Sequence, residues 1–324
     1  MGTTGQSAAN ALYRIFLEFV YLEKAQERQL LLSALLKGRM QLVYPRLIAL
    51  CSLAFCCLPV RAQRTQLPMI SAAPGTVVRW RGAGTIRCGM KGRSWAALHG
   101  TCYYPIDLEQ APGTRIAITR SGAGRTHLAH ITVEAVDYGS EDITLPDIPQ
   151  ANPSPADLRR DARDRAQLAK IFNRRESMAK FTLPLAAPAT PLPPEKSFGA
   201  KRSFNGKPAA QPHTGVDYAT PVGSPIMAVA DGTVVMAEDM FFEGNAVFID
   251  HGDGLISMYF HLADIKVTAG EEVKKGHILG RVGSTGRATG PHLFFGIRWH
   301  DARIDPHFVL EEPSKIPEVQ DPSS

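Results

Sequence analysis

The chain has 324 residues and a net charge of +5 at neutral pH, and 44% of its residues are hydrophobic and 21% charged. This composition is ordinary for a globular protein, and the length suggests about two domains with accessory segments. No cluster of Arg and Lys with interleaved aromatic residues occurs, which argues against a nucleic-acid partner. The mild basic excess is compatible with an anionic polymer of the cell envelope.

The first predicted element is a secretory signal. Residues 47–60, LIALCSLAFCCLPV, form an apolar run of 14 residues that follows Arg46 and precedes a small-residue cleavage site. The run is shorter than the roughly 20 residues that a membrane-spanning helix needs. We therefore expect residues 1–62 to comprise an N-terminal extension and a signal peptide that starts at Met40 and is cleaved after Ala62. The mature chain would be exported to the periplasm or cell envelope and would carry no membrane span.

Residues 1–39, upstream of this signal, have two interpretations. They are either an overlong gene-start assignment or a real amphipathic extension, because YRIFLEFVYLEKAQERQLLLSALLKG has helix-like character. Sequencing the N-terminus of the secreted protein tests the signal itself: the mature chain should begin at Gln63, whereas a mature chain that retains LIALC would favour a membrane anchor.

Residues 63–150 are predicted to form a small β domain. The runs TVVRW, TRIAITR and HITVEAV are β-branched and partly alternating, and glycine pairs and APG segments separate them. Cleavage of the signal leaves Cys88 and Cys102, an even number in an exported chain. A disulfide between them is expected, with two buried free thiols as the alternative.

Residues 151–195 are predicted to be a helix followed by a proline-rich linker. Ser154 is a plausible N-cap, Pro155 suits the first helical position, and Asp157 stands where a capping box places its acid. The segment after Phe181, TLPLAAPATPLPPE, holds five prolines and reads as a stiff, extended connection. The predicted apolar side of the helix, which would pack lightly on a neighbour, consists of residues at helical spacing: Leu158, Ala162, Ala166, Ala169 and Phe172.

Residues 196–312 are predicted to form a second, larger β domain, followed by a tail at 313–324. Strand-like runs such as NAVFIDHG and LISMYFHL recur between glycine turns, and no helical period lasts ten residues. The whole chain is therefore expected to be mainly β, with two domains, the second an antiparallel β-sandwich.

Four short motifs in this second domain carry side chains suited to chemistry. They are HTGVD with His213 and Asp217, MYFHL with His261, the glycine-rich GSTGRATG at 283–290, and His292 in PHLFF. Each alone is a weak signal, because HxxxD occurs by chance and a histidine on a strand is usually structural. Phe294 stands two positions after His292 and would face the same side of a strand.

Taken together, these motifs resemble the lysostaphin-type (LytM, M23) metallopeptidases, which cut the peptide cross-bridges of peptidoglycan. The likeness covers about residues 196–312 and also includes the closing IDP. It implies peptidoglycan peptides as the substrate and a Zn²⁺ cofactor. Zinc suits amide hydrolysis because it lowers the pKa of bound water to about 7 and takes three protein ligands plus that water.

The resemblance also assigns roles to individual residues. The zinc ligands of the family are the His and Asp of HxxxD and the second His of HxH, which correspond to His213, Asp217 and Phe294. Its two further histidines, which position and deprotonate the water or stabilise the oxyanion, correspond to His261 and His292. The chain departs from the pattern at one ligand, because the benzyl ring of Phe294 cannot donate to zinc.

Three consequences of Phe294 are open at the level of sequence. His292 could move onto the metal and leave His261 as the only base, zinc could bind weakly through His213 and Asp217, or the site could be empty. The first interpretation of the chain is therefore an exported zinc endopeptidase of peptidoglycan whose activity is weakened. The alternative is a non-catalytic domain of the same fold that binds cell wall or activates an amidase.

Overall fold

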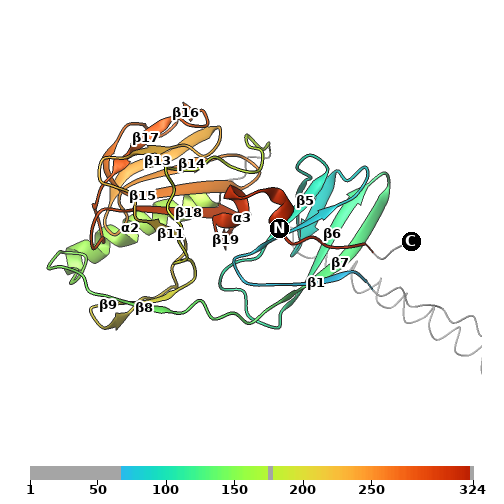
Figure 1. Ribbon diagram of the computed structural model, residues 1–324, viewed down its shortest axis with the longest axis horizontal. Helices are drawn as coiled ribbons and strands as arrows, with labels where there is room; N and C mark the ends of the chain where they lie inside the picture. The colour runs from blue at the N-terminus through green and yellow to red at the C-terminus, as the bar shows by residue number, and fades with distance from the viewer. Residues whose placement is uncertain (1–66, 174–177, 322–324) are drawn as a thin grey trace, which may run out of the picture. The chain divides into compact units, whose positions relative to one another are not determined.

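The computed structural model describes residues 67–173 and 178–321. Thr65–Ser324 form one compact unit, most of which is β structure, as the alternating runs predicted (Figure 1). The predicted extension and signal segment lie outside the described residues. Among the helices of the described part, none is long and apolar enough to cross a membrane.

The N-terminal part of this unit consists of a five-stranded sheet, in the order β1-β7-β6-β3-β4, and a ribbon of β2 and β5. Apolar and polar residues alternate along these strands, so that one face of the sheet is buried. In β6, for example, Ile116 and Ile118 are buried while the residues next to them are more exposed. Both sheets contribute to one hydrophobic core around Trp80, Tyr104 and Ile131. The strands are β1 (Met69–Ala72), β2 (Val77–Arg81), β3 (Arg87–Met90), β4 (Arg93–Ala96), β5 (Thr101–Pro105), β6 (Arg115–Gly122) and β7 (Arg125–Val133).

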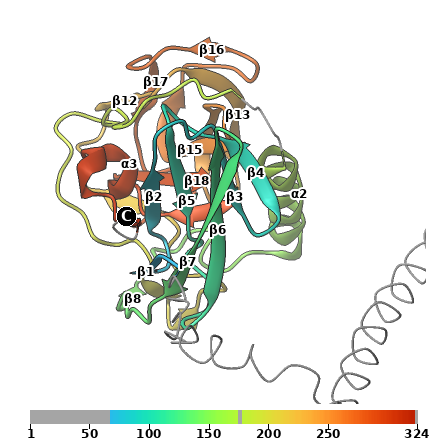
Figure 2. The same cartoon turned by 90° about the vertical axis from the view of Figure 1, so that its right-hand side faces the viewer.

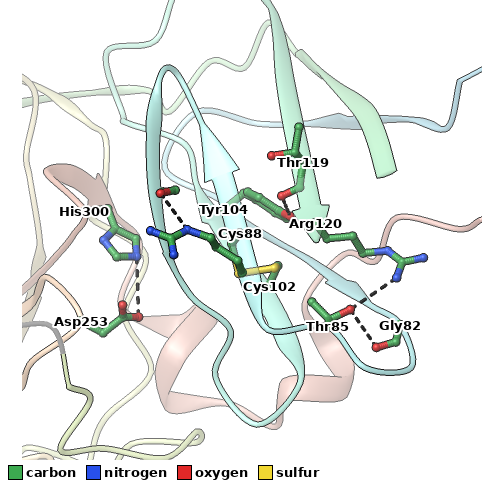
Figure 3. The surroundings of a disulfide bond; sticks show 11 residues. Gly82, Thr85, Cys88, Cys102, Tyr104, Thr119, Arg120, Asp253 and His300 are labelled. Atoms are coloured by element: carbon green, nitrogen blue, oxygen red, sulfur yellow. Dashed lines mark hydrogen bonds and ion pairs between the residues drawn. A yellow bond between two sulfur atoms is a disulfide. The ribbon is translucent and has the colours of Figure 1, made fainter. Parts of the chain in front are cut away.

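A disulfide joins the sheet to the ribbon. Cys88 of β3 and Cys102 of β5 are bonded, which confirms the predicted pairing (Figure 3). Beside them, the hydroxyl of Tyr104 donates to the carbonyl oxygen of Thr119 at 2.8 Å. A cross-link that closes a loop of this size restricts the unfolded chain and stabilises the fold by about 3 kcal/mol.

The predicted helix is α2 (Pro155–Phe172), and its predicted start is confirmed. The side chain of Ser154 accepts a hydrogen bond from the backbone of Asp157, and the Asp157 carboxylate accepts one from the backbone of Ser154 at 3.0 Å. This reciprocal capping box satisfies two backbone donors that the first turn would otherwise leave free.

The predicted contact face of α2 is wrong. Leu158 is 52% exposed, and the alanines of the predicted stripe are exposed as well. Polar side chains instead hold the helix to its neighbour: Arg160 pairs with Asp239 at 2.8 Å, and Asp164 accepts from the backbone N–H of Phe241 at 2.8 Å. Ile171 is buried, and Leu168 and Phe172 pack against the same hydrophobic cluster. Of the predicted stripe only Phe172 makes such a contact, and the inward side of the helix is set by these apolar residues together with the polar contacts.

The C-terminal part is built on one antiparallel network in which β11-β18-β15-β14-β13-β16 are neighbours. The core under this network contains Tyr218, Tyr259, Phe295 and Trp299, each essentially inaccessible to solvent. The strands described here are β11 (Val216–Tyr218), β12 (Pro225–Met227), β13 (Gly232–Met240), β14 (Gly244–Asp250), β15 (Leu255–Ile265), β16 (Glu272–Val273), β17 (Ile278–Val282), β18 (Leu293–Trp299) and β19 (Ala302–Ile304). A short helix, α3 (His307–Leu310), follows the last strand.

A separate small sheet lies across the predicted border at residue 150. It has the order β10-β9-β8, and β8 pairs in parallel with β9. The strands are β8 (Ser140–Ile143), β9 (Lys201–Phe204) and β10 (Lys207–Pro208). One strand that the sequence assigns to the N-terminal domain therefore pairs with a strand from the C-terminal one.

Two segments that the sequence left without tertiary contacts pack against the rest of the unit. The proline-rich linker is extended, but Leu185 is buried and its N–H donates to the carbonyl oxygen of Val309 at 2.8 Å. The predicted tail begins with η1 (Pro313–Lys315), and Val319 donates its N–H to the carbonyl oxygen of Arg79 in β2. Figure 2 shows β2 beside its partner strand β5.

Candidate functional site

Strand pairing brings the sequence motifs together at one end of the C-terminal sheet. β18 lies between β11 and β15, so that Phe294 is opposite Asp217 on one side and Phe260 on the other. His292 stands just before β18 and forms an isolated bridge with Gly283 of the glycine-rich loop. Residues far apart in sequence thus become neighbours because three antiparallel strands are adjacent.

A bulge in β15 sets the direction of His261. Tyr259 pairs with Val247 and Leu262 pairs with Asn245, so the two residues between them on β15 face only one residue on β14. His261 takes a left-handed conformation there, with φ +64°. Such a conformation is uncommon for a residue with a Cβ, and bulges often redirect a side chain beside an active site.

Each of the three motif histidines is held by a hydrogen bond from its ring to the backbone carbonyl group of a different residue. Nδ1 of His213 lies 3.0 Å from the oxygen of Ser197, Nδ1 of His261 2.8 Å from that of Thr285, and Nδ1 of His292 2.9 Å from that of Gly290. A carbonyl oxygen only accepts, so each Nδ1 carries the proton. In the neutral ring each Nε2 is then an unprotonated acceptor, available as a metal ligand or a base.

Two of these Nε2 atoms, those of His213 and His292, lie beside the carboxylate of Asp217. Oδ1 of Asp217 is 3.2 Å from Nε2 of His213 and 3.7 Å from Nε2 of His292. The rings of His261 and His292 have centroids 4.7 Å apart. The structure therefore brings together all four residues that the sequence singled out: His213, Asp217, His261 and His292.

Charge and burial set the protonation of this cluster. Burial alone would raise the pKa of Asp217, but His213, Arg202 and His292 outweigh it and hold that pKa well below its usual range. Burial, with a smaller contribution from His292, lowers the pKa of His261 to about 4. At neutral pH the carboxylate is ionised and His261 is uncharged.

Arg202 is a site residue that the sequence motifs did not reveal. Its guanidinium donates to Oδ2 of Asp217 at 2.8 Å and to the carboxylate of Glu141 at 2.8 Å. It reaches the site from β9, in the small separate sheet. No local pattern marks it, because only tertiary structure brings β9 to the end of β11.

Phe294 occupies the position where the resemblance expects a third ligand. Its ring stacks on Phe260 with centroids 4.5 Å apart and planes 3° apart, and it meets the His213 ring edge-on at 5.3 Å. The fit is close, because a Cβ on Gly215 would come within 2.6 Å of the Phe294 ring. The side chain is 6% exposed and offers only carbon atoms to the cluster.

His213 and Asp217 fit a zinc ion as a pair. Nε2 of His213 and Oδ1 of Asp217 are buried and have no hydrogen-bond partner. Two acceptors that face each other need a proton or a cation between them. The 3.2 Å distance between these two atoms is close to the roughly 3.4 Å that separates two ligand atoms of a tetrahedral zinc ion. Within the described residues, however, no group of three or more His, Cys, Asp or Glu side chains is arranged to hold a metal. The set is one protein ligand short of a usual catalytic site.

The cluster opens into a groove with a volume of about 930 Å³. The histidines and Asp217 line one part of it, and residues of α2 and of the small sheet line another. Phe294, Phe260, Phe248 and Met258 add an apolar surface. The groove is large enough for a peptide of several residues.

A histidine and carboxylate cluster on an antiparallel sheet, beside a peptide-sized groove, is chemically suited to the hydrolysis of a peptide bond and indicates the peptidase class. The family model for peptidase family M23 matches residues 211–306. A crystal structure from Pseudomonas aeruginosa that carries the M23 peptidase description is 30% identical and superposes with a TM-score of 0.55, covering 74% of this chain and 94% of that one. The chain belongs to peptidase family M23.

Curated relatives match this same part of the chain. The peptidoglycan DD-endopeptidase ShyC of Vibrio cholerae is 47% identical over 108 residues, which are 33% of this chain and 24% of that protein. The DD-carboxypeptidase/endopeptidase Mpg of Neisseria meningitidis is 43% identical over 94 residues, 29% of this chain and 22% of that protein. The chain thus spans about a quarter of the length of these relatives.

Proposed function

We propose that this chain is an exported, peptidoglycan-directed zinc metallopeptidase that hydrolyses peptide cross-bridges in the periplasm or cell envelope, with weakened metal binding. Family membership and the peptidoglycan endopeptidases among its relatives support the substrate. The apolar run at 47–60 supports export. The observation that carries the proposal is the set of three histidines gathered beside Asp217, each of which has its Nδ1 bonded to a backbone carbonyl so that Nε2 remains as the acceptor.

In this proposal, His213 and Asp217 would hold the zinc ion. Bound zinc supplies Lewis acidity and lowers the pKa of water to about 7. Arg202 keeps Asp217 oriented by occupying its second oxygen, which leaves Oδ1 directed at His213. Such outer partners of a ligand usually matter for metal affinity.

His261 and His292 are the proposed catalytic residues. His261 is uncharged at neutral pH, and its Nδ1 is already used, so its Nε2 can accept a proton from a water that attacks the peptide carbonyl carbon. Nε2 of His292 lies close by, and in its protonated form it can donate to the developing oxyanion or to the leaving amine. Both rings are held by backbone carbonyls, so their orientation does not depend on substrate.

Phe294 favours weak metal binding. A site that lacks one imidazole ligand should lose at least the roughly 10–100-fold in affinity that disturbing an outer partner typically causes. The same residue supports the second candidate function, a non-catalytic domain that binds cell wall or activates an amidase. The retained histidines favour the first candidate, because a purely binding surface has no need for three free Nε2 atoms.

The Phe294→His variant tests this proposal against wild type, with Phe294→Leu as the matched control that keeps an apolar side chain. We expect zinc affinity and muropeptide release to rise about 10–100-fold in Phe294→His and to stay at the wild-type level in Phe294→Leu. Zinc titration and chromatography of digested cell wall measure the two quantities. Equal zinc binding and equal rates for wild type and Phe294→His would refute the weakened site. Stoichiometric zinc in Phe294→His without any release would favour the binding domain.

A further inference from the structure

The glycine-rich loop carries a cation that the motifs above do not explain. The guanidinium of Arg287 lies between two aromatic rings, with Cζ 4.1 Å from the centre of the Phe204 ring and 4.5 Å from that of Phe242. The backbone N–H of Arg287 donates to the carbonyl oxygen of Phe242 at 2.8 Å. Stacking holds the plane of a guanidinium in place and leaves the N–H groups at its edge free to donate.

Arg287 differs from the other arginines of the groove. Five arginines of the described part line it, and four of them donate to acceptors within the protein. Their partners are Asp161 for Arg165, Glu141 and Asp217 for Arg202, the carbonyl oxygen of Asp301 for Arg298, and Asp107 and Glu109 for Arg303. Within residues 67–173 and 178–321, the guanidinium of Arg287 has no hydrogen bond or ion pair. Burial lowers its pKa, and the nearby carboxylate of Glu243, which does not bond to it, partly opposes that effect.

The loop connects Arg287 to the catalytic histidines. The N–H of His261 donates to the carbonyl oxygen of Glu243, the residue after Phe242, and Nδ1 of His261 is bonded to Thr285, two residues before Arg287. Arg287 and His261 are thus held by the same two segments, at 242–243 and 285–287. A ligand group bound by Arg287 would therefore lie near a bond that is cleaved beside His261.

We propose that Arg287 binds a free carboxylate of the peptide substrate, close to the scissile bond. This inference rests on the proposed peptidase function and narrows its substrate class to peptides that carry an anionic carboxylate beside the bond that is cut. The chemistry fits because a planar guanidinium binds a carboxylate through two parallel hydrogen bonds. The two rings already hold the side chain, so little rotamer entropy is lost on binding.

The test uses two synthetic cross-bridge peptides that differ in one group. One carries a free carboxylate next to the scissile amide, and the other carries the carboxamide at the same position. Wild type is compared with Arg287→Gln and with the control Arg281→Gln, which removes an arginine outside the groove that pairs with Asp264. Calorimetry measures the binding of each peptide, and chromatography measures its hydrolysis.

We expect wild type and Arg281→Gln to bind the carboxylate peptide at least about 10-fold more tightly than the carboxamide. Arg287→Gln should bind both peptides with the affinity that wild type has for the carboxamide, which also shows that the variant is folded. Equal affinities in wild type, or an equal loss for both peptides in Arg287→Gln, overturns the subsite. A carboxylate preference without any hydrolysis refutes the proposed function and leaves the subsite standing. Hydrolysis without any preference for the carboxylate peptide refutes the subsite and leaves the proposed function standing.

Discussion

At the residue scale, the site brings together the four residues that the sequence singled out and one position, Phe294, that departs from the family pattern. The Nδ1 bonds of His213, His261 and His292 all run to backbone carbonyls, so the tautomers do not depend on any side chain of the cluster. The change at Phe294 is absorbed by stacking on Phe260. A single side chain of the cluster can therefore be substituted without changing the orientation of the remaining histidines.

Arg202 allows a test of how Asp217 is oriented. In Arg202→Met, Oδ2 of Asp217 loses its 2.8 Å partner, and Oδ1 is no longer held toward His213. We expect zinc affinity and peptide hydrolysis to fall about 10–100-fold, as for the loss of other outer partners of metal ligands. Zinc competition titration measures the affinity. Arg281→Met, which removes an arginine paired with Asp264, should change neither quantity. An unchanged zinc affinity in Arg202→Met would contradict the orienting role.

The sequence was sufficient for part of the site and insufficient for the rest. Four site residues could be predicted because they lie in short motifs that can be recognised in the sequence itself: His213, Asp217, His261 and His292. Arg202 acts from β9, and the rings on either side of Arg287 come from β9 and from the end of β13. Those contacts are created by tertiary packing: Arg202 and Asp217 are 15 residues apart, and the two rings are 83 and 45 residues from Arg287, so no local pattern encodes them.

At the element scale, α2 shows how far local signals reach. The capping box is a contact between residues three apart, so the start of the helix could be predicted from Ser154 and Asp157. The inward face depends on partners outside the helix, such as Asp239 and the N–H of Phe241, which sequence periodicity does not include. Ile171, near the end of α2, lies in the same hydrophobic cluster as Phe294.

This packing predicts unequal effects for two apolar residues of α2. Ile171 is 6% exposed, so Ile171→Ala should lower the free energy of unfolding by about 2–4 kcal/mol and raise hydrogen exchange in the last turns of the helix. Leu158 is 52% exposed and belongs to the stripe that the sequence favoured, so Leu158→Ala should cost less than about 0.5 kcal/mol. Urea unfolding and exchange mass spectrometry measure both. The reverse order of effects would restore the stripe as the contact face.

At the scale of the whole folded unit, the N-terminal and C-terminal sheets are joined by paired charges and stacked rings. Arg303, after β18, pairs with Asp107, and the ring of Trp95 in β4 lies 4.1 Å from that of His300. His300 in turn faces Asp253 (Figure 3). The mainly β architecture could be predicted from alternation, but the Arg303–Asp107 and Trp95–His300 contacts could not, because they join residues 196 and 205 positions apart.

The Asp253 contact predicts a pH dependence of stability. Burial raises the pKa of Asp253 to about 7, whereas the unfolded chain has the ordinary value of 3.8. Between these values the folded state holds a proton that the unfolded state releases, so the contribution of Asp253 to stability is full below about pH 4 and is lost as the pH rises to about 7. Above pH 7 it no longer changes. The loss amounts to about 1–4 kcal/mol, because His300, whose Nε2 is 3.7 Å away, partly compensates the ionised carboxylate.

The Asp253→Asn variant isolates this contribution, because the amide keeps the shape of the protonated acid and does not titrate. Urea unfolding of wild type and variant at pH 5, 6, 7 and 8 should show the variant gaining relative stability with each step up to about pH 7 and then holding a constant difference. Other titrating groups, such as the buried His251, act on both proteins alike and cancel in the difference. Parallel curves across the whole range would show that Asp253 is ionised in the folded state throughout. Its carboxylate would then be a permanent partner of His300, the residue against which Trp95 of the N-terminal sheet packs.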